Sequence, residues 1–254
     1  MPGDPVIEVN NLCLRMGNLD ILQNVSFELA EEETLVILGK NASGKTMLLK
    51  TMVGLFHPQA GYTRFFGQNI YELKGEELDE LRKDIGYVFQ KSGLFDSLTV
   101  AENVIFGLRR FTNTDEEALA QKAIECLHRS GLKDAEAKLP SELSGGMQKR
   151  AAMARAIAMN PKILLMDDPT AGLDPVLTDA IADLIIELRN TLQCTSIVIT
   201  HDLKFARKLA DRIGLMVDGQ LHTVVGVDEF DNTDEPFITQ FRTGSLEGPI
   251  PIIE

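Results

Sequence analysis

The sequence has few of the features that mark secreted, disulfide-linked or membrane-spanning proteins. Its cysteines, Cys13, Cys126 and Cys194, are scattered without a C-x-x-C spacing, which argues against a zinc site and a disulfide framework. We therefore expect a reducing, cytosolic compartment. No apolar run approaches the length of about 20 residues that a membrane span needs. Residues 1–5 lack a basic segment followed by an apolar one, so no signal peptide is expected.

Basic residues are also few compared with acidic residues. The 254 residues include 25 Lys and Arg against 38 Asp and Glu, which gives a formal net charge of −13. A chain of that sign is a poor candidate for binding nucleic acid. With 44% hydrophobic and 25% charged residues, the composition is typical of a globular protein. The length suits one large α/β domain with a subdomain.

The stretch GKNASGKT at residues 39–46 is the clearest motif in the chain. It fits the pattern G-x-x-x-x-G-K-[ST], follows the apolar run 35–38 and precedes a helical segment at 47–56, which is the strand, loop and helix context of a P-loop. Its glycines let backbone N–H groups converge on a phosphate, and the helix adds its positive dipole end. Lys45 is expected to reach the β- and γ-phosphates, and the Thr46 hydroxyl to bind Mg²⁺. The predicted nucleotide-binding residues of this stretch are Gly39, Lys40, Asn41, Ala42, Ser43, Gly44, Lys45, Thr46 and Met47.

Several segments around the P-loop are predicted to be strands. Residues 6–16 and 21–29 are typical of a hairpin, and further short strands are expected at 62–66 and 85–89. The unbroken apolar run 163–166, capped by two carboxylates, indicates a strand buried on both faces of a parallel sheet, and another buried strand is predicted at 196–200. A hairpin around Asp218 is expected at 212–221.

A helical subdomain is predicted at about 95–160. Helical patterns cover 100–110 and 114–129, where Thr114 and Glu117 have the spacing of a capping box. Another helix is predicted from Ser144 to 159, and one at 175–192. The ATP-binding domain is expected to end at 226. The acidic tail at 227–254, with Phe237, Ile238 and Phe241 at helical spacing, is read as a solvated segment, with packing on a neighbouring copy as the alternative.

The carboxylates Asp167 and Asp168 end one of the predicted buried strands. A carboxylate beside a P-loop commonly holds the magnesium ion or its water, so Asp167 is the metal candidate. On its own, such a pair is more often a device that solvates a strand end. Its position after a P-loop favours the metal-binding interpretation.

These residues, taken together, resemble ABC-type ATPase cassettes. Residues 143–147 read LSGGM, followed by Asp167-Asp168, by residues 171–174, which read AGLD, and by His201. The resemblance covers nearly the whole chain and implies an ATP-binding α/β core with a parallel sheet, an N-terminal antiparallel β subdomain and an inserted helical subdomain. It also implies two copies that sandwich two ATP molecules head to tail.

The resemblance implies a role for each matching residue. Ser144 begins a helix, and Gly145 and Gly146 leave its backbone bare, so that a γ-phosphate bound to the other copy could meet the helix dipole. Gln90 would contact the metal ion or the attacking water, and His201 would contact the γ-phosphate. Asp174 resembles the loop aspartate that communicates across the dimer. Without the resemblance, Gln90 and His201 would read as structural residues.

Two positions depart from the usual cassette pattern. Asp168 stands where a glutamate normally polarises the attacking water. Loss of one methylene withdraws the carboxylate by roughly 1.5 Å, and a misplacement of about 1 Å can cost on the order of 100-fold in rate, so slow but nonzero hydrolysis is expected. Met16 stands where many cassettes carry an aromatic that stacks on adenine, and a methionine would cover the ring less selectively.

Residues 90–100, the methionine of LSGGM and residues 244–250 are similar to the MlaF-type ATPases, which drive phospholipid movement between bacterial membranes. That resemblance implies an integral membrane permease, with MCE-domain and STAS-domain partners, and a location on the inner face of the cell membrane. Three alternatives stay open: a small-solute importer subunit, a soluble ABC ATPase acting on ribosomes or DNA, and a nucleotide-binding regulatory module.

Overall fold

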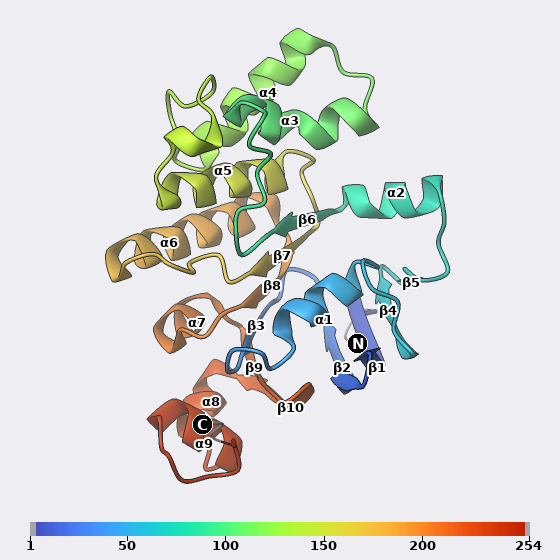
Figure 1. The fold of residues 1–254 in the computed structure, drawn as a ribbon, viewed down its shortest axis with the longest axis vertical. Helices are drawn as coiled ribbons and strands as arrows, with labels where there is room; N and C mark the ends of the chain where they lie inside the picture. Colours follow the sequence, from blue (N-terminus) through green and yellow to red (C-terminus); the bar gives the residue numbers. More distant parts are fainter. Residues whose placement is uncertain (1–3, 252–254) are drawn as a thin grey trace. The chain divides into compact units, whose positions relative to one another are not determined.

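The computed structural model describes residues 4–251. The chain divides into two compact units (Figure 1): the first comprises the residues up to Leu78 and those from Ile197 onward, and the second comprises Asp79–Ser196. No helix within the described range has both the length and the apolar character needed to cross a lipid bilayer. The predicted P-loop belongs to the first unit, whereas the predicted aspartate pair and LSGGM segment belong to the second.

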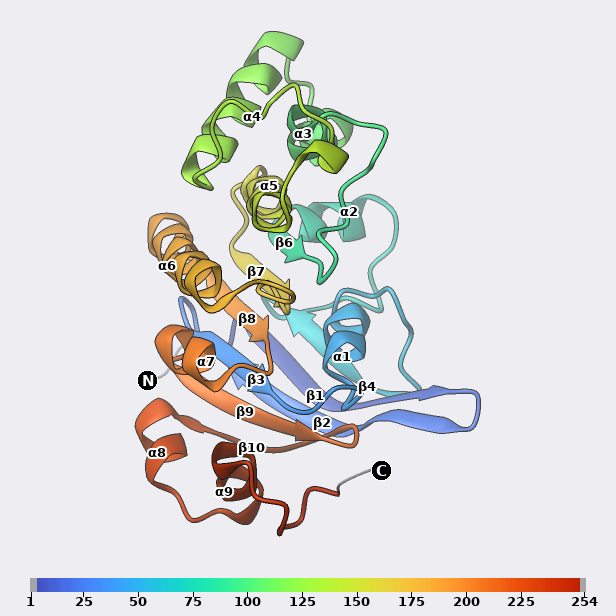
Figure 2. The same cartoon turned by 60° about the vertical axis from the view of Figure 1, so that its left-hand side comes forward.

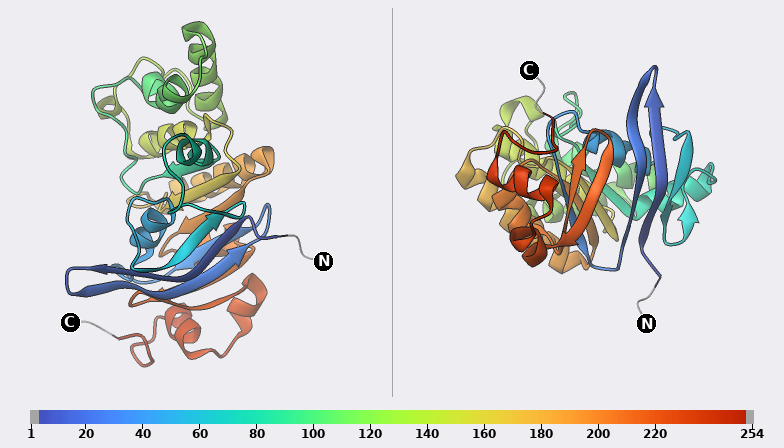
Figure 3. Two further views of the ribbon diagram at one scale, coloured as in Figure 1. Left: turned by 90° about the vertical axis from the view of Figure 1, so that its right-hand side faces the viewer. Right: turned by 90° about the horizontal axis from the view of Figure 1, so that it is seen from below.

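The first unit contains an antiparallel sheet with the strand order β2-β1-β4-β5. Along β2, Val25, Phe27 and Leu29 are buried, while the residues between them are exposed. This alternation is what a strand with one face on a core requires. Val9 of β1 lies opposite Phe27, and the two strands form the long dark-blue hairpin of Figure 3. The bounds are β1 (Ile7–Met16), β2 (Leu19–Leu29), β4 (Ala60–Phe65) and β5 (Gln68–Asn69).

A second group of strands in the first unit carries the P-loop. The strand β3 is buried along its whole length and pairs in parallel with β9, Val36 opposite Ile213. The strand order is β10-β9-β3-β8, of which the first unit holds residues 197–199 of β8. Helix α1 begins two residues earlier than the predicted start at 47. It also ends before the predicted end at 56, because Gly54 takes a φ of 74° and stops the helix. The bounds are β3 (Thr34–Leu38), α1 (Lys45–Met52), β8 (Thr195–Ile199), α7 (Leu203–Leu209), β9 (Arg212–Val217) and β10 (Gln220–Gly226).

The second unit combines parallel strands with the helices α3 to α6. Ile85 of β6 lies opposite Ile163 of β7, and β7 is fully buried, as its apolar run predicts. Helix α5 packs on α3, α4 and β6. The bounds are α2 (Glu76–Lys83, which crosses the boundary between the units), β6 (Ile85–Val88), α3 (Val100–Phe111), α4 (Glu116–Arg129), η1 (Pro140–Glu142), α5 (Gly145–Ile157), β7 (Ile163–Asp167) and α6 (Pro175–Leu192).

The start of α4 differs from the sequence prediction. The N-cap is Asp115, whose side chain accepts a hydrogen bond from the main chain of α4, and not Thr114. A carboxylate is the stronger cap because its charge also favours the positive end of the helix. The Thr114 hydroxyl bonds instead to that of Thr112, at 2.8 Å. A capping box does occur one helix earlier, between Thr99 and Glu102 at the start of α3.

The C-terminal tail is packed rather than solvated. It forms α8 (Val227–Asn232) and α9 (Pro236–Thr243), and α8 contacts β9 and β10. Both helices lie in red beside these strands in Figure 2. Phe230 and Ile238 are each 0% exposed. The expectation of a solvated segment is therefore wrong, because the chain covers the tail's apolar side chains itself.

Candidate nucleotide-binding and catalytic site

The predicted P-loop has a backbone that only glycine fits at two positions. Gly39 has a φ of 154°, and a Cβ there would lie 2.2 Å from the main-chain oxygen of Met216. Gly44 has a φ of 100°, and a Cβ there would lie 2.8 Å from the main-chain oxygen of Ile21. Since both neighbours are backbone atoms, they cannot give way to a side chain. Strands β2 and β9 thus fix the shape of the loop.

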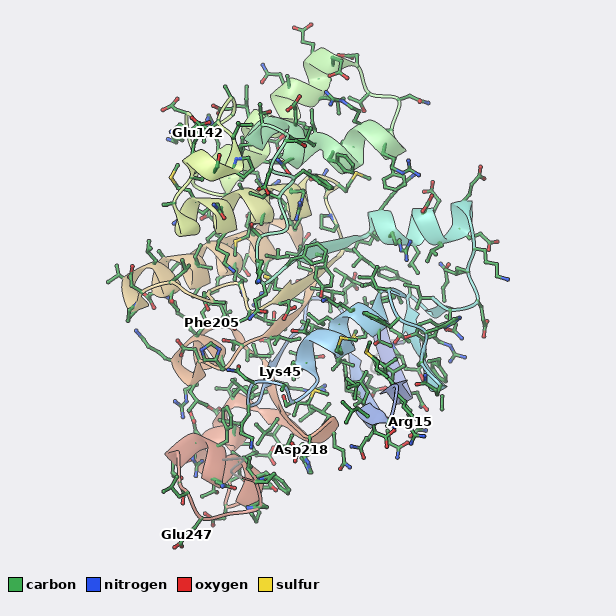
Figure 4. All side chains as sticks on the ribbon, viewed as in Figure 1. Arg15, Lys45, Glu142, Phe205, Asp218 and Glu247 are labelled. Atoms are coloured by element: carbon green, nitrogen blue, oxygen red, sulfur yellow. The ribbon has the colours of Figure 1, made fainter. Side chains whose placement is uncertain are left out.

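Helix α1 starts with a bare N-terminus. Its N-cap, Gly44, provides no side-chain acceptor, and no acidic residue lies in the first turn. The N–H groups and the dipole at such a terminus favour an anion. Lys45, labelled in Figure 4, donates from Nζ to the carbonyls of Gly39 at 2.8 Å and Lys40 at 2.6 Å. The ammonium group, with the half-buried Thr46 beside it in sequence, therefore lies against the loop that would hold the phosphates.

The outer side of the P-loop borders the C-terminal segment. A cavity of about 550 Å³ is lined by residues 40–43, by Asp218 and by C-terminal residues between Gln240 and Pro251. The Lys40 ammonium donates to the main-chain carbonyl of Pro251. Other predicted nucleotide-binding residues are accessible from solvent, since Asn41 and Ala42 are exposed and Met47 is half-buried. The sequence carries no local signal for this contact, because its two sides are far apart along the chain.

Met16, predicted to cover the adenine ring, is the last residue of β1. Its side chain is 45% exposed, and that of its cross-strand partner Leu19 is 68% exposed. The Met16 side chain would offer an apolar thioether to a ring but no hydrogen-bonding group that would distinguish one base from another.

The aspartate pair ends β7 as predicted. Asp167 is 2% exposed and Asp168 is 8% exposed. Burial raises the pKa of Tyr87 on β6, and the charge of Asp167 adds to that rise. Asp168 has a φ of 43°, a left-handed conformation that aspartate adopts more readily than longer side chains do. The backbone therefore gives a physical reason for aspartate at this position.

Two basic side chains of α5 hold the loop that follows β6. Lys149, which is 5% exposed, donates to the carbonyl of Gln90 and, at 3.5 Å, to that of Asp168. Arg155 donates to the carbonyl of Ser92 at 2.8 Å. Burial lowers the pKa of Lys149, and the Asp168 charge opposes that shift. The sequence gives no signal for these contacts, because a basic residue on a helix usually faces solvent.

The predicted LSGGM segment begins α5 at the surface. Ser144 is the N-cap, and its hydroxyl accepts a hydrogen bond from the main chain of Met147 at 3.4 Å. Ser144 and Gly145 are exposed, and a Cβ on Gly145 would meet nothing within 4 Å. Gly146 is buried, with Leu177 over it. The start of the helix therefore presents bare backbone to solvent.

The remaining predicted residues are distributed between the units. Asp174 caps α6, because its carboxylate accepts hydrogen bonds from the main chain of Val176 and Leu177 at 2.9 and 3.0 Å; the sequence prediction did not include this structural role. Gln90 is exposed after β6 in the second unit, and His201 is exposed after β8 in the first.

Magnesium fits the chemistry of the predicted donors. Over residues 4–251, no three His, Cys, Asp or Glu side chains cluster as a metal site. Mg²⁺, however, is usually held by one or two carboxylates together with phosphate oxygens and water. Asp167, the Thr46 hydroxyl and the Gln90 amide oxygen supply hard oxygen donors of that kind. The residues thus suit an ion that arrives with a nucleotide.

A buried strand, a glycine loop and a helix with a lysine folded over that loop define a P-loop nucleotide-binding protein. Residues 22–171 match the family described as ABC transporter. The chain belongs to this family, as one of its ATP-binding cassettes, and cassettes of this class bind and hydrolyse ATP.

Individual relatives agree with that assignment. The chain is 36% identical over 245 residues to the intermembrane phospholipid transport system ATP-binding protein MlaF of Haemophilus influenzae, covering 96% of this chain and 93% of that protein. It is 35% identical over 254 residues to the probable ribonucleotide transport ATP-binding protein mkl of Mycobacterium leprae, covering 100% of this chain and 73% of that protein. A dimeric post-hydrolysis structure of the ATP-binding cassette MJ0796, bound to ADP and Pi, is similar with a TM-score of 0.80 and 33% identity over 87% of this chain and 98% of that one. The predicted α/β P-loop cassette fold is confirmed.

Proposed function

We propose that the chain is the ATP-binding subunit of a lipid transporter, in which two copies close head to tail on two ATP molecules and drive a membrane permease. One observation supports the head-to-tail closure above all: besides α1, a second helix begins with a bare N-terminus that could bind a phosphate. Helix α5 begins at the surface with an exposed Gly145 and no acidic residue in its first turn. The dimeric ADP- and Pi-bound cassette similar to this chain is consistent with a second copy supplying that helix start.

In the closed dimer, each catalytic residue has a distinct task. Lys45 and the P-loop N–H groups would bind the β- and γ-phosphates and stabilise the charge that develops on them. Asp168 would accept the proton of the attacking water, and His201 would contact the γ-phosphate. Loss of the γ-phosphate removes the contacts to Ser144 of the other copy, so the dimer would open and the permease would move.

Magnesium would be held by Thr46, Asp167 and Gln90 and would neutralise phosphate oxygens when bound. Its donors come from the P-loop, the end of β7 and the loop after β6. Asp174, at the start of α6, would carry the state of one site to the other copy.

An apolar groove in the second unit suits the permease. It has a volume of about 480 Å³. Phe95 and Phe106 line it, are each 45% exposed, and have ring centroids 4.7 Å apart. Arg82 and Lys83 add positive charge. Exposed aromatics rimmed by polar groups are typical of protein interfaces, and we assign this groove to a cytoplasmic segment of the permease, which would place the chain at the inner face of the cell membrane.

The sandwich is tested by adding a negative charge at the start of α5. A Cβ on Gly145 would meet nothing within 4 Å among the described residues, and a glutamate suits a helix N-terminus, but the Gly145→Glu carboxylate would repel a γ-phosphate brought by a second copy. In an Asp168→Asn background that slows hydrolysis, ATP should produce dimers on size-exclusion chromatography, and Gly145→Glu should abolish them without loss of ATP binding. Ala118→Glu, in the first turn of α4, is the matched control. Dimers that persist with Gly145→Glu would refute the arrangement.

The transported substrate is tested with the permease that copurifies from membranes. The name of the MlaF relative favours phospholipid, and the name of the mkl relative favours a ribonucleotide and hence the small-solute alternative. With phospholipid as the substrate, we propose MCE-domain and STAS-domain proteins as further partners. In proteoliposomes, we expect phospholipid acyl chains in the permease and ATP hydrolysis stimulated by phospholipid. Stimulation by a soluble nucleotide instead, in detergent that lacks phospholipid, would favour the second candidate.

A further inference from the structure

The ammonium group of Lys149 joins two main-chain segments of the second unit. One is the loop after β6, through the carbonyl of Gln90, and the other is the turn after β7, through the carbonyl of Asp168 at 3.5 Å. The Asp168 carbonyl also accepts a hydrogen bond from the main chain of Ala171 at 3.1 Å. Lys149 therefore contacts the backbone of the turn that carries the proposed catalytic carboxylate.

This arrangement is not what stability alone would favour. Lys149 is 5% exposed, so its charge has lost most of its hydration, and an apolar side chain of similar length would avoid that loss. Arg155, on the same helix, binds the carbonyls of Ser92 and Gly93. The loop after β6 is thus anchored twice, but within residues 4–251 the side-chain hydrogen bonds of Arg155 reach only this loop, whereas those of Lys149 also reach Asp168.

We propose that Lys149 is a positioning residue for hydrolysis, which couples the loop that starts at Gln90 to the turn at Asp168. This inference rests on the proposed function, because it assumes that Asp168 activates the attacking water. Phe89 and Gly93 line the groove assigned to the permease. A displacement of this loop by the permease would move the Gln90 carbonyl, and Lys149 would pass that movement to Asp168.

The test compares Lys149→Met with Arg155→Met in steady-state hydrolysis, nucleotide binding and thermal unfolding. Lys149→Met keeps the length of the side chain but removes the donor. We expect it to lower kcat on the order of 10- to 100-fold, as a displaced catalytic group does, with unchanged KM for ATP and an unfolding temperature that is not lowered. Arg155→Met loosens the same loop and should lower kcat much less. Equal losses in the two variants would show that anchoring of the loop alone matters, and would overturn the proposal.

A double-mutant cycle separates this inference from the proposed function. If Lys149 acts through Asp168, Lys149→Met should add little to the loss caused by Asp168→Asn. Full additivity would overturn the role of Lys149 while leaving that of Asp168 intact. An Asp168→Asn variant with normal turnover would instead refute the proposed catalysis itself. Should Lys149→Met fail to fold, Lys149→Gln serves the same cycle, because its amide is too short to reach both carbonyls.

Discussion

The ammonium nitrogen of Lys45 lies 2.6 Å from the main-chain oxygen of Lys40, so the side chain of the first residue of α1 is folded over the loop that precedes it. On binding a triphosphate, Lys45 is expected to exchange these carbonyl partners for phosphate oxygens. A hydrogen bond to a charged group contributes about 1.5–3 kcal/mol, so Lys45→Met should weaken ATP binding by roughly 10- to 100-fold, measured with a fluorescent nucleotide. Lys50→Met removes the same charge from the last turn of α1 and should bind ATP as the unaltered protein does.

We expect the short side chain of Asp168 to limit the rate of ATP hydrolysis. In a phosphate-release assay, Asp168→Glu should raise turnover on the order of 10- to 100-fold, since the carboxylate then reaches about 1.5 Å farther toward the water, and Asp168→Asn should lower it to a small residual rate. The φ of 43° adds a second expectation. Glutamate tolerates this conformation less well, so Asp168→Glu should lower the free energy of unfolding by about 1 kcal/mol or less. Unchanged turnover in Asp168→Glu would remove the explanation.

The exposed methionine at the end of β1 predicts weak base discrimination. If Met16 covers the base as predicted, it would offer only a polarizable thioether to the ring, so the protein should hydrolyse ATP and GTP with similar kcat/KM. Met16→Tyr should raise the preference for ATP through stacking, whereas Leu19→Tyr, an aromatic at the opposite exposed position, should not. A strong preference for ATP in the unaltered protein would contradict this account of Met16.

The parts of the site that depend on short stretches of sequence were predictable. The P-loop follows from glycines whose positions are forced by backbone neighbours, as at Gly39 and Gly44, and from a buried strand directly before them. The start of α5 at Ser144 follows from the capping preference of serine. In each case the residue that decides the structure lies within a few positions of the feature it determines.

Contacts between distant segments were not predictable. Nothing in residues 145–157 distinguishes Lys149 from a solvated lysine, because its partners Gln90 and Asp168 lie elsewhere in the chain. The tail was misread for the same reason: its composition is acidic and polar, yet α8 packs on β9 and β10, and Phe230 and Ile238 are buried. The start of α4 was misplaced because Thr114 and Asp115 are both good caps, and local geometry selects between them.

The buried tail yields a prediction about stability. Arg207 of α7 pairs with Asp231 of α8 at 2.6 Å, and Phe230 is 0% exposed. Phe230→Ala should lower the free energy of unfolding by about 3–5 kcal/mol, because it removes a buried ring and leaves a cavity. The measurement is urea unfolding followed by circular dichroism, which suits a chain without tryptophan.

Leu246→Ala is the matched control for that experiment, because Leu246 is 79% exposed and its loss should change the free energy of unfolding by less than about 0.5 kcal/mol. Truncation after Gly226 should destabilise the monomer at least as much as Phe230→Ala does. If truncation left the stability of the monomer intact but weakened ATP-dependent dimers, the tail would pack on the neighbouring copy instead, since its apolar side chains must be covered by one chain or the other.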